Sequence, residues 1–200
     1  MSNILLYAEV TKENYLHTVL FELAYKAQEL SKKLNNADVS ALLICKTGLA
    51  ESFKEAFINS GFDTVYIAED DSFADYSTEL YAKAAVDIIK EINPDIMLIG
   101  ATTQGRDLAP RISASLHTGL TADCTTLDIR SNTDMIQIRP AFGGNIMAQI
   151  SITKSRPQFA TVRYRVMDAA QKVESTKGEV IVCSVKEEMK QSPIEILKSE

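Results

Sequence analysis

The sequence contains no tryptophan, only two histidines and only three cysteines in 200 residues. Cys45, Cys124 and Cys183 lie far apart and form no C-x-x-C pair, and so few histidines disfavour a zinc site. Cys124 directly follows Asp123, whose charge would oppose a thiolate. We therefore expect three reduced, unreactive thiols and no metal centre.

The chain also lacks an excess of positive charge and any long apolar run. Its 21 lysines and arginines face 27 acidic residues, for a net charge of -6 and a pI near 5.1. Nucleic acid needs a basic face, so it is not an expected partner. No apolar run reaches the roughly 18 residues that span a bilayer, and the N-terminus has no basic region of a signal peptide. These absences predict a bacterial-type cytoplasmic protein without membrane insertion.

Signatures of catalysis are missing as well. We find no Ser-His-Asp order, no paired-carboxylate motif, no metal constellation and no catalytic cysteine pattern. The prediction is that this chain has no catalytic residues and is not an enzyme by itself. With 46% hydrophobic and 24% charged residues, its composition suits one globular domain.

The first half alternates apolar strands with amphipathic helices. Such alternation predicts an α/β fold with a doubly wound, mostly parallel sheet, of the adenine-nucleotide-hydrolase-like kind. Glu9, Lys46, Glu69 and Thr102 should gather at the carboxyl edge, where such sheets bind ligands. His17 could face a ligand from the first turn of its helix, but a partly exposed surface position is favoured because no carboxylate or cysteine motif accompanies it. We expect strands over 4–9, 39–45, 64–68 and 96–100, and helices over 14–35, 49–59 and 78–92.

The stretch from Gly100 to Asp123 follows the strand over 96–100. Gly100 and Gly105 have P-loop spacing, but Arg106 and Asp107 stand where a P-loop needs Lys and Ser or Thr. The alternative is a capped helix start. With Asp107 as N-cap, Pro110 would fall at the third helical position, where its missing N–H costs nothing. That alternative is favoured.

After residue 120 the pattern changes to strands in series, which predicts an antiparallel, β-rich C-terminal extension. Gly143 and Gly144 mark either a turn or an anion-contacting nest, and the turn is favoured. The charged segment over 186–200 is interpreted as a linker or tail. We expect strands over 121–130, 134–139, 145–153, 159–165 and 179–185, with a loop over 173–178.

Three motifs carry a resemblance to a known family. They are GATTQGRDLAPRISASLHTGLTADCTTLDI from Gly100, RPAFGGNIMAQI from Arg139 and RPQFATVR from Arg156. In this order they resemble the N-terminal domain of the alpha subunit of electron transfer flavoproteins. The family usually carries Pro-Gly after the last motif, where this chain has Tyr164 and Arg165.

The resemblance implies an electron carrier that works as a heterodimer with a beta subunit. Such proteins take electrons from acyl-CoA or other flavin dehydrogenases, or from NADH, and pass them on through FAD. It implies an N-terminal scaffold domain over 1–185, with a parallel core over about 1–120 and the extension over about 121–185. The family's FAD residues lie in a C-terminal domain whose motifs do not occur here, so no flavin is expected on this chain alone.

Two other functions remain open. One is a free-standing nucleotide-binding module that uses the edge at Gly100, and the other is an enzyme of the nucleotide-hydrolase superfamily. The enzyme is disfavoured because no pyrophosphate motif is present.

The extension is the predicted partner surface. It combines apolar residues with arginines, the composition typical of interface cores. An alternative is that these apolar residues close a second small core. The candidate interface residues are Arg139, Phe142, Arg156 and Arg163.

Overall fold

The computed structural model describes residues 2–169 and 178–191. A seven-stranded sheet has the order β10-β3-β2-β1-β4-β9-β5, and every neighbouring pair in it is parallel. Its strands are β1 (Asn3–Ala8), β2 (Asp38–Cys45), β3 (Thr64–Glu69), β4 (Ile96–Gly100), β5 (Leu120–Cys124), β9 (Gln158–Val162) and β10 (Glu179–Val182). The helices are α1 (Val19–Lys33), α2 (Lys54–Ile58), α3 (Thr78–Ile92) and α4 (Thr103–Ser115).

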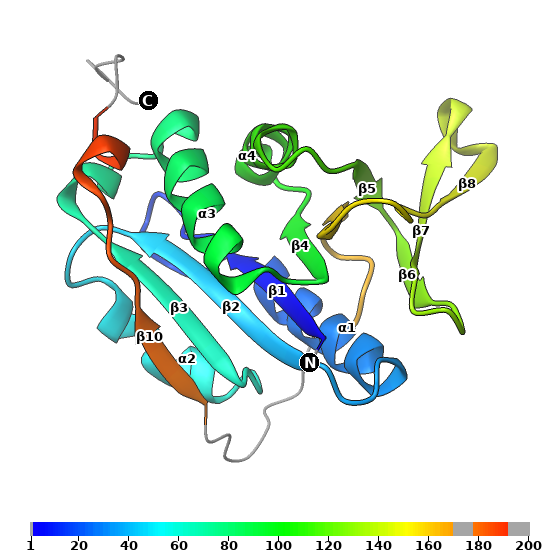
Figure 1. Ribbon diagram of the computed structural model, residues 1–200, viewed down its shortest axis with the longest axis horizontal. Coiled ribbons are helices and arrows are strands. Elements are labelled where there is room, and N and C mark those ends of the chain that lie inside the picture. The colour runs from blue at the N-terminus through cyan, green and yellow to red at the C-terminus, as the bar shows by residue number, and fades with distance from the viewer. Residues whose placement is uncertain (1, 170–177, 192–200) are drawn as a thin grey trace.

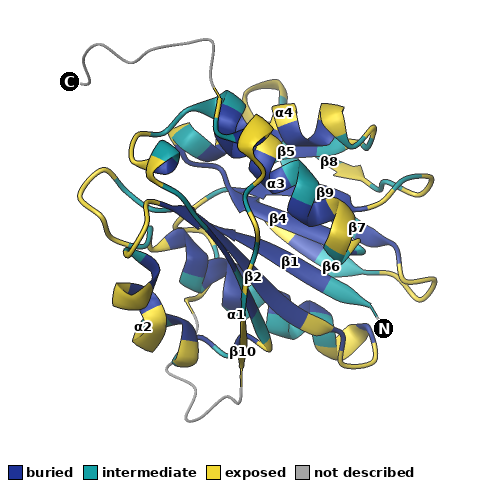
Figure 2. Cartoon of the chain, turned by 60° about the vertical axis from the view of Figure 1, so that its left-hand side comes forward, coloured by how far each residue is buried: buried dark blue, intermediate teal, exposed yellow. Residues whose placement is uncertain are grey.

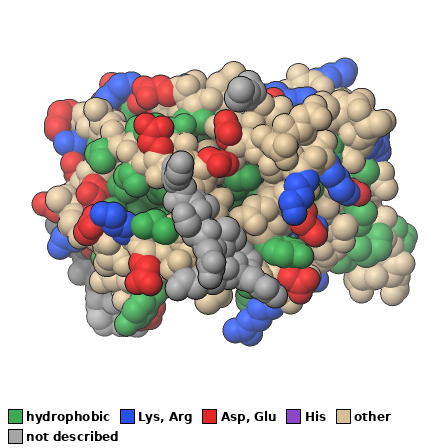
Figure 3. All heavy atoms as spheres, turned by 90° about the horizontal axis from the view of Figure 1, so that it is seen from below, with side chains coloured by type: hydrophobic (Ala, Val, Ile, Leu, Met, Phe, Trp, Pro, Cys, Tyr) green, Lys and Arg blue, Asp and Glu red, His purple; other side chains and the backbone are tan. Residues whose placement is uncertain are grey.

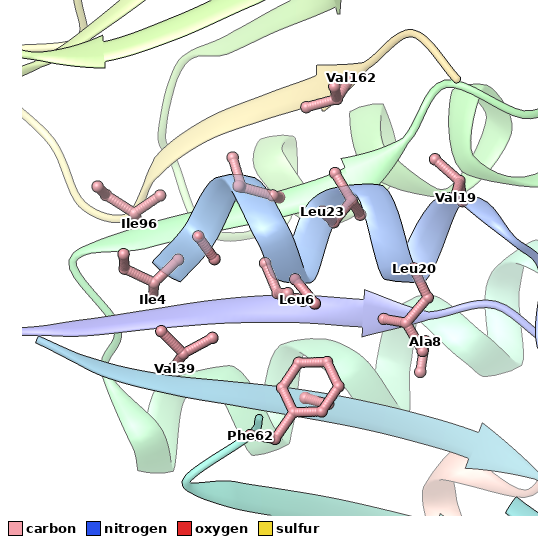
Figure 4. Packing of buried hydrophobic residues seen from close by; sticks show 14 of the residues in the cluster. Ile4, Leu6, Ala8, Val19, Leu20, Leu23, Val39, Phe62, Ile96 and Val162 are labelled. Atoms are coloured by element: carbon pink, nitrogen blue, oxygen red, sulfur yellow. The ribbon is translucent and has the colours of Figure 1, made fainter. Parts of the chain in front are cut away.

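Helices cover both faces of this sheet because the central strands are apolar on both sides. Ile4 and Leu6 of β1 pack toward α1, whereas Leu5 and Tyr7 belong to the core under α3 and α4. Figure 4 shows the first of these cores, with side chains of β1 and β4 meeting Leu23 of α1. The predicted doubly wound α/β fold is confirmed.

The antiparallel part is confined to a small second sheet, β6-β7-β8. We call it the arm, because it extends away from the main sheet beyond β5 (Figure 1). In Figure 2 the main strands are dark blue, that is, buried, while the arm is largely teal and yellow, that is, of intermediate burial or exposed. The arm consists of β6 (Thr126–Ile129), β7 (Met135–Ala141) and β8 (Ile146–Ile150), with a 3-10 turn at Phe142–Gly144.

The prediction that all late strands pair antiparallel holds only for the arm. β9 inserts between β4 and β5, and β10 adds beside β3, all in parallel. All five residues of β9 are buried, so this strand completes the core instead of covering it. The single strand expected over 121–130 is also wrong: it breaks at Thr125 into β5 and β6, and the register of β5 shifts between Thr121 and Cys124, where Asp123 adopts a φ of 62°.

Helix α1 begins later, and helix α4 begins earlier, than the sequence suggests. α1 starts at Val19, not near Asn14, because Val10 and Leu16 form an isolated β-bridge and Asn14 takes a φ of 61°. The Nδ1 of His17 then accepts the N–H of Val19 at the helix start. α4 starts at Thr103, five residues before the predicted helix at 108.

The segment after β10 lies against α3 instead of leaving the domain at once. Met189 is buried, Lys186 Nζ contacts Asp87 at 2.8 Å and Lys190 Nζ contacts Asp70 at 3.0 Å. Of the predicted loop and tail, residues 173–177 and 192–200 lie outside the described part of the chain.

Figure 3 shows the underside of the molecule. Acidic and basic side chains are intermixed there, and the hydrophobic ones form small groups. The described residues on that face form no basic field of the kind that nucleic acid requires.

Candidate functional site

A cleft of about 750 Å³ opens at the carboxyl edge of the main sheet. It lies over the ends of β1, β2 and β4. The chain passes from β1 to β2 on one side, while β4 pairs with the other side of β1, so the strand order reverses here. This reversal is where open α/β sheets bind ligands.

A buried carboxylate forms the floor of the cleft. Glu9 follows β1, is 6% exposed, and accepts a hydrogen bond from the Thr102 hydroxyl at 2.5 Å. Burial raises the pKa of Glu9 above its ordinary value, while the bond from Thr102 and the nearby His17 partly lower it. The raised pKa means that keeping Glu9 charged in this buried place costs free energy. Such perturbed groups are typical of functional sites.

Thr102 is the N-cap of α4, and the prediction that Asp107 has this role is wrong. The Thr102 hydroxyl accepts the N–H of Gly105 at 2.9 Å. Asp107 instead accepts hydrogen bonds from Tyr76 and Thr78 across the cleft. The signal in the sequence was Thr102 itself, since threonine is a good N-cap residue. It could be recognised only by knowing that α4 starts directly after β4.

The two glycines with P-loop spacing allow close packing at the end of β4. A Cβ on Gly105 would lie 1.9 Å from the Gly100 carbonyl oxygen, and one on Gly100 would lie 2.5 Å from Val19 Cγ1. Only glycine therefore lets α1 and α4 approach the end of β4. Pro110 lies inside α4, so it was not confined to the first turn as the sequence suggested.

Aromatic rings form one wall of the cleft. Phe73, Tyr76 and Tyr81 all line it. Tyr81 meets Phe73 edge-on at 5.4 Å between centroids and Tyr76 at 5.0 Å. The Tyr76 hydroxyl is fixed by its 2.9 Å bond to Asp107 Oδ2, so the ring is held in place. No sequence motif marks this wall, since its members come from α3 and from the segment that joins β3 to it.

The residues predicted at this edge separate into two groups. Glu9, Lys46 and Thr102 line the cleft. Glu69 does not, because its Oε1 accepts the N–H of Ala50 at 2.9 Å. His17 is partly exposed, as predicted, and it also lines the cleft, which was the less favoured alternative.

The predicted interface residues fall in two places. Arg139 lies on β7 and Phe142 at the tip of the arm, where it is 84% exposed. On β8, Ile146 and Met147 are 54% and 53% exposed, and Ile150 is 37% exposed. Adjacent strand residues point to opposite faces, so β8 presents apolar side chains on both of its faces.

The other two arginines have partners within the chain. Arg163 binds Asp123 through Nη2 at 2.6 Å and Nε at 3.2 Å, and it lowers the pKa of that carboxyl. Arg156 contacts Asp134 at 3.5 Å and donates to the carbonyl of Ser155 at 3.0 Å. Both arginines therefore have a structural role next to the arm.

Neither a metal site nor a membrane-spanning helix occurs among the described residues. They contain no cluster of histidine, cysteine and acidic residues that could hold a metal ion, and no helix long and apolar enough to cross a bilayer. Burial raises the pKa of Cys45 and of Cys124 to about 12, as expected for unreactive thiols.

Comparison with known proteins agrees with the resemblance found in the sequence. The family model described as the electron transfer flavoprotein domain matches residues 4–188. Subunit LctC of the lactate dehydrogenase (NAD(+),ferredoxin) of Acetobacterium woodii is 42% identical over 93% of this chain and 44% of its own length. The electron transfer flavoprotein subunit alpha of Thermoanaerobacterium thermosaccharolyticum is 43% identical over 90% of this chain and 53% of its own.

A third relative, protein FixB of Azorhizobium caulinodans, is 39% identical over 83% of this chain and 45% of its own length. The chain thus spans about half the length of the curated relatives it matches. A family model that covers almost the whole sequence, together with these identities, shows to which family the chain belongs. It belongs to the electron transfer flavoprotein family and matches the N-terminal domain of its alpha subunits.

Proposed function

We propose that this chain is the scaffold domain of an electron transfer flavoprotein alpha subunit and docks a beta subunit through its arm. The complete assembly would pass electrons from a flavin dehydrogenase, such as an acyl-CoA dehydrogenase, or from NADH through FAD. This domain would hold the subunits together and carry out no catalytic step itself.

The observation that carries the proposal is the exposure of the arm. Phe142, Met147 and Ile146 are more than half exposed on a short sheet that projects from the body of the domain. An edge strand with apolar side chains on both faces is an aggregation hazard unless a partner covers it. A beta subunit is the partner that family membership supplies.

The chain's own cleft does not fit the pyrophosphate of FAD. The N-terminus of α4 would be its natural anion site, but Glu9 and Asp107 already place two carboxylates at this end. In our proposal the flavin is therefore held by other parts of the complete protein, and no residue of this chain is assigned to it.

Co-expression with the cognate beta subunit tests the proposal. Met147→Asp places a charge in the apolar arm, and we expect it to abolish co-purification without changing the melting temperature of the isolated chain. Val182→Asp is the matched control, since Val182 is 72% exposed on β10 at the far edge of the main sheet. Equal loss with both variants, or no loss with Met147→Asp, would contradict the proposed surface.

Charge reversal at the arginines separates interface from fold. Arg139→Glu should weaken assembly and leave stability unchanged. Arg163→Glu should lower the melting temperature, because it breaks the bidentate pair with Asp123. If Arg139→Glu unfolds the isolated chain instead, the arm closes a core within this chain.

A further inference from the structure

The cleft at the sheet edge is distinct from the proposed partner surface, and its chemistry calls for a ligand of its own. Its volume of about 750 Å³ lies within the range of small-molecule sites, roughly 300–1,000 Å³. None of the arm residues lines it. What the cleft binds therefore depends on the groups on its floor and wall.

The floor offers a buried carboxylate that can accept further hydrogen bonds. Thr102 donates to Glu9 Oε2, and a carboxylate has about four acceptor sites, so this one bond leaves acceptor capacity unused. Glu9 is more than nine-tenths buried, yet it lines the cleft. A ligand group that can donate a hydrogen bond is therefore favoured beside Glu9.

The same floor offers donors without acceptors. The first four N–H groups of a helix have no partner within it. In α4 the N–H of Gly105 bonds to the Thr102 side chain and that of Arg106 to the Thr102 carbonyl. The N–H groups of Thr103 and Gln104 are left at the cleft.

An acceptor and donors side by side match a pair of neighbouring hydroxyl groups. Each hydroxyl can donate to the carboxylate and accept from an amide. A phosphate does not fit, because it would meet the charges of Glu9 and Asp107. Carboxylates also bind the ribose hydroxyls in dinucleotide-binding sheets.

The aromatic wall of the cleft determines which group fits beside the pair of hydroxyls. The Tyr76 ring is fixed through Asp107 and Tyr81, and Phe73 and Leu49 add apolar surface beside it. A rigid aromatic surface suits a flat ring, which can stack on it or meet it edge-on.

We propose that this cleft binds a nucleoside, with the ribose hydroxyls on Glu9 and the first amides of α4 and the base against Tyr76. The phosphate of a nucleotide would lie at the mouth near Lys46 and would not be required. The proposal does not depend on the arm or on a beta subunit.

Calorimetric titration of the 200-residue chain tests the inference. The probes are adenosine, guanosine, cytidine and uridine, because the base is not specified. At least one should bind with a Kd below millimolar, and its 2′-deoxy form should bind at least tenfold more weakly. No binding by any of the four at millimolar concentration would overturn the proposal.

Variants identify the site. Glu9→Gln should weaken binding at least tenfold, because the amide nitrogen cannot accept from the ribose, and it should fold because the amide oxygen still accepts from Thr102. Tyr76→Leu should weaken binding of the base. Glu55→Gln, an equal change on the exposed face of α2, is the control and should bind as the wild type does.

Three results would contradict the inference. They are equal affinity after Glu9→Gln, equal affinity for the 2′-deoxy ligand, and binding of AMP without binding of adenosine. The last result would show that the phosphate, not the ribose, is recognised.

Discussion

Replacing Thr102 with valine removes both hydrogen bonds of the side chain that joins α4 to the floor of the cleft. Valine has nearly the same shape but neither accepts the N–H of Gly105 nor donates to Glu9. Loss of an N-cap costs about 1 kcal/mol, and a lost hydrogen bond to a buried charge costs about 1.5–3 kcal/mol. Glu9 can limit the second cost by taking up a proton.

The expected loss is therefore about 2–4 kcal/mol. In a chain of 200 residues, 1 kcal/mol lowers the melting temperature by about 2–4 °C, so we expect a fall of about 5–15 °C. Thermal melts followed by circular dichroism measure it. Thr102→Ser keeps both bonds and should lose less than about 1 kcal/mol.

A double-mutant cycle with Glu9→Gln measures how much the charge of Glu9 adds to the bond between the two side chains. Glu9→Gln alone should leave stability equal or higher, because it removes a buried charge and keeps the acceptor. In that background Thr102→Val should cost about 1–2 kcal/mol less than in the wild type. If Thr102→Val is no worse than Thr102→Ser, or no worse than Asp107→Ala, the reasoning about the cap is refuted.

Three further predictions concern the fold. Gly105→Ala should cost about 3 kcal/mol or more, although alanine favours helix elsewhere, because its Cβ would lie 1.9 Å from the Gly100 oxygen; an unchanged urea midpoint would contradict this. Arg165→Gly should raise the free energy of unfolding by up to about 1 kcal/mol, since Arg165 has a φ of 60° that glycine adopts without strain, and a clear loss would show that the side chain compensates. Asp123→Asn should cost under about 1 kcal/mol at neutral pH, because the part-exposed pair with Arg163 is lost. The folded pKa of Asp123 is lowered, so its contribution is present above about pH 4 and is lost as pH falls through the folded pKa. Melts of both proteins should converge in acid, and a constant difference at every pH would contradict that assignment.

Local pattern was sufficient for the core of the fold. The uninterrupted apolar residues of β1 and β4 required burial on both faces, and the stripes of α1 and α3 supplied the covering. The doubly wound arrangement follows from these periodicities alone. The edge of the sheet where Glu9 and Thr102 meet could be predicted for the same reason.

Strand order and helix starts were not predictable in this way. β9 has the same pattern as an antiparallel addition, and only contacts with β4 and β5, distant in sequence, place it inside the sheet. The start of α4 depends on the close approach of Gly105 to the Gly100 carbonyl, which is a tertiary contact. The position of Pro110 favoured Asp107 as the cap, because the rule that confines proline to the first helical turn cannot register that contact.

For the candidate surfaces too, the sequence alone indicates some residues and misses others. Phe142 and Arg139 could be singled out because apolar residues and arginines are typical of interfaces. Arg156 and Arg163 share that composition, yet carboxylates from elsewhere in the chain bind them. The aromatic wall at Tyr76 carries no sequence motif and becomes visible only when η2 and α3 are packed over the cleft; η2 is the 3-10 turn at Asp71–Phe73.

Hydrogen exchange of the chain with and without the cognate beta subunit tests the central proposal most directly. β8 is an edge strand of the arm, so part of its amides are free to exchange in the isolated chain. We predict that peptides covering 142–150 become protected on complex formation, while those covering 179–182 in β10 do not change. Protection at β10 with an unchanged arm, or no protection at either place, would contradict the assignment of the arm as the docking surface.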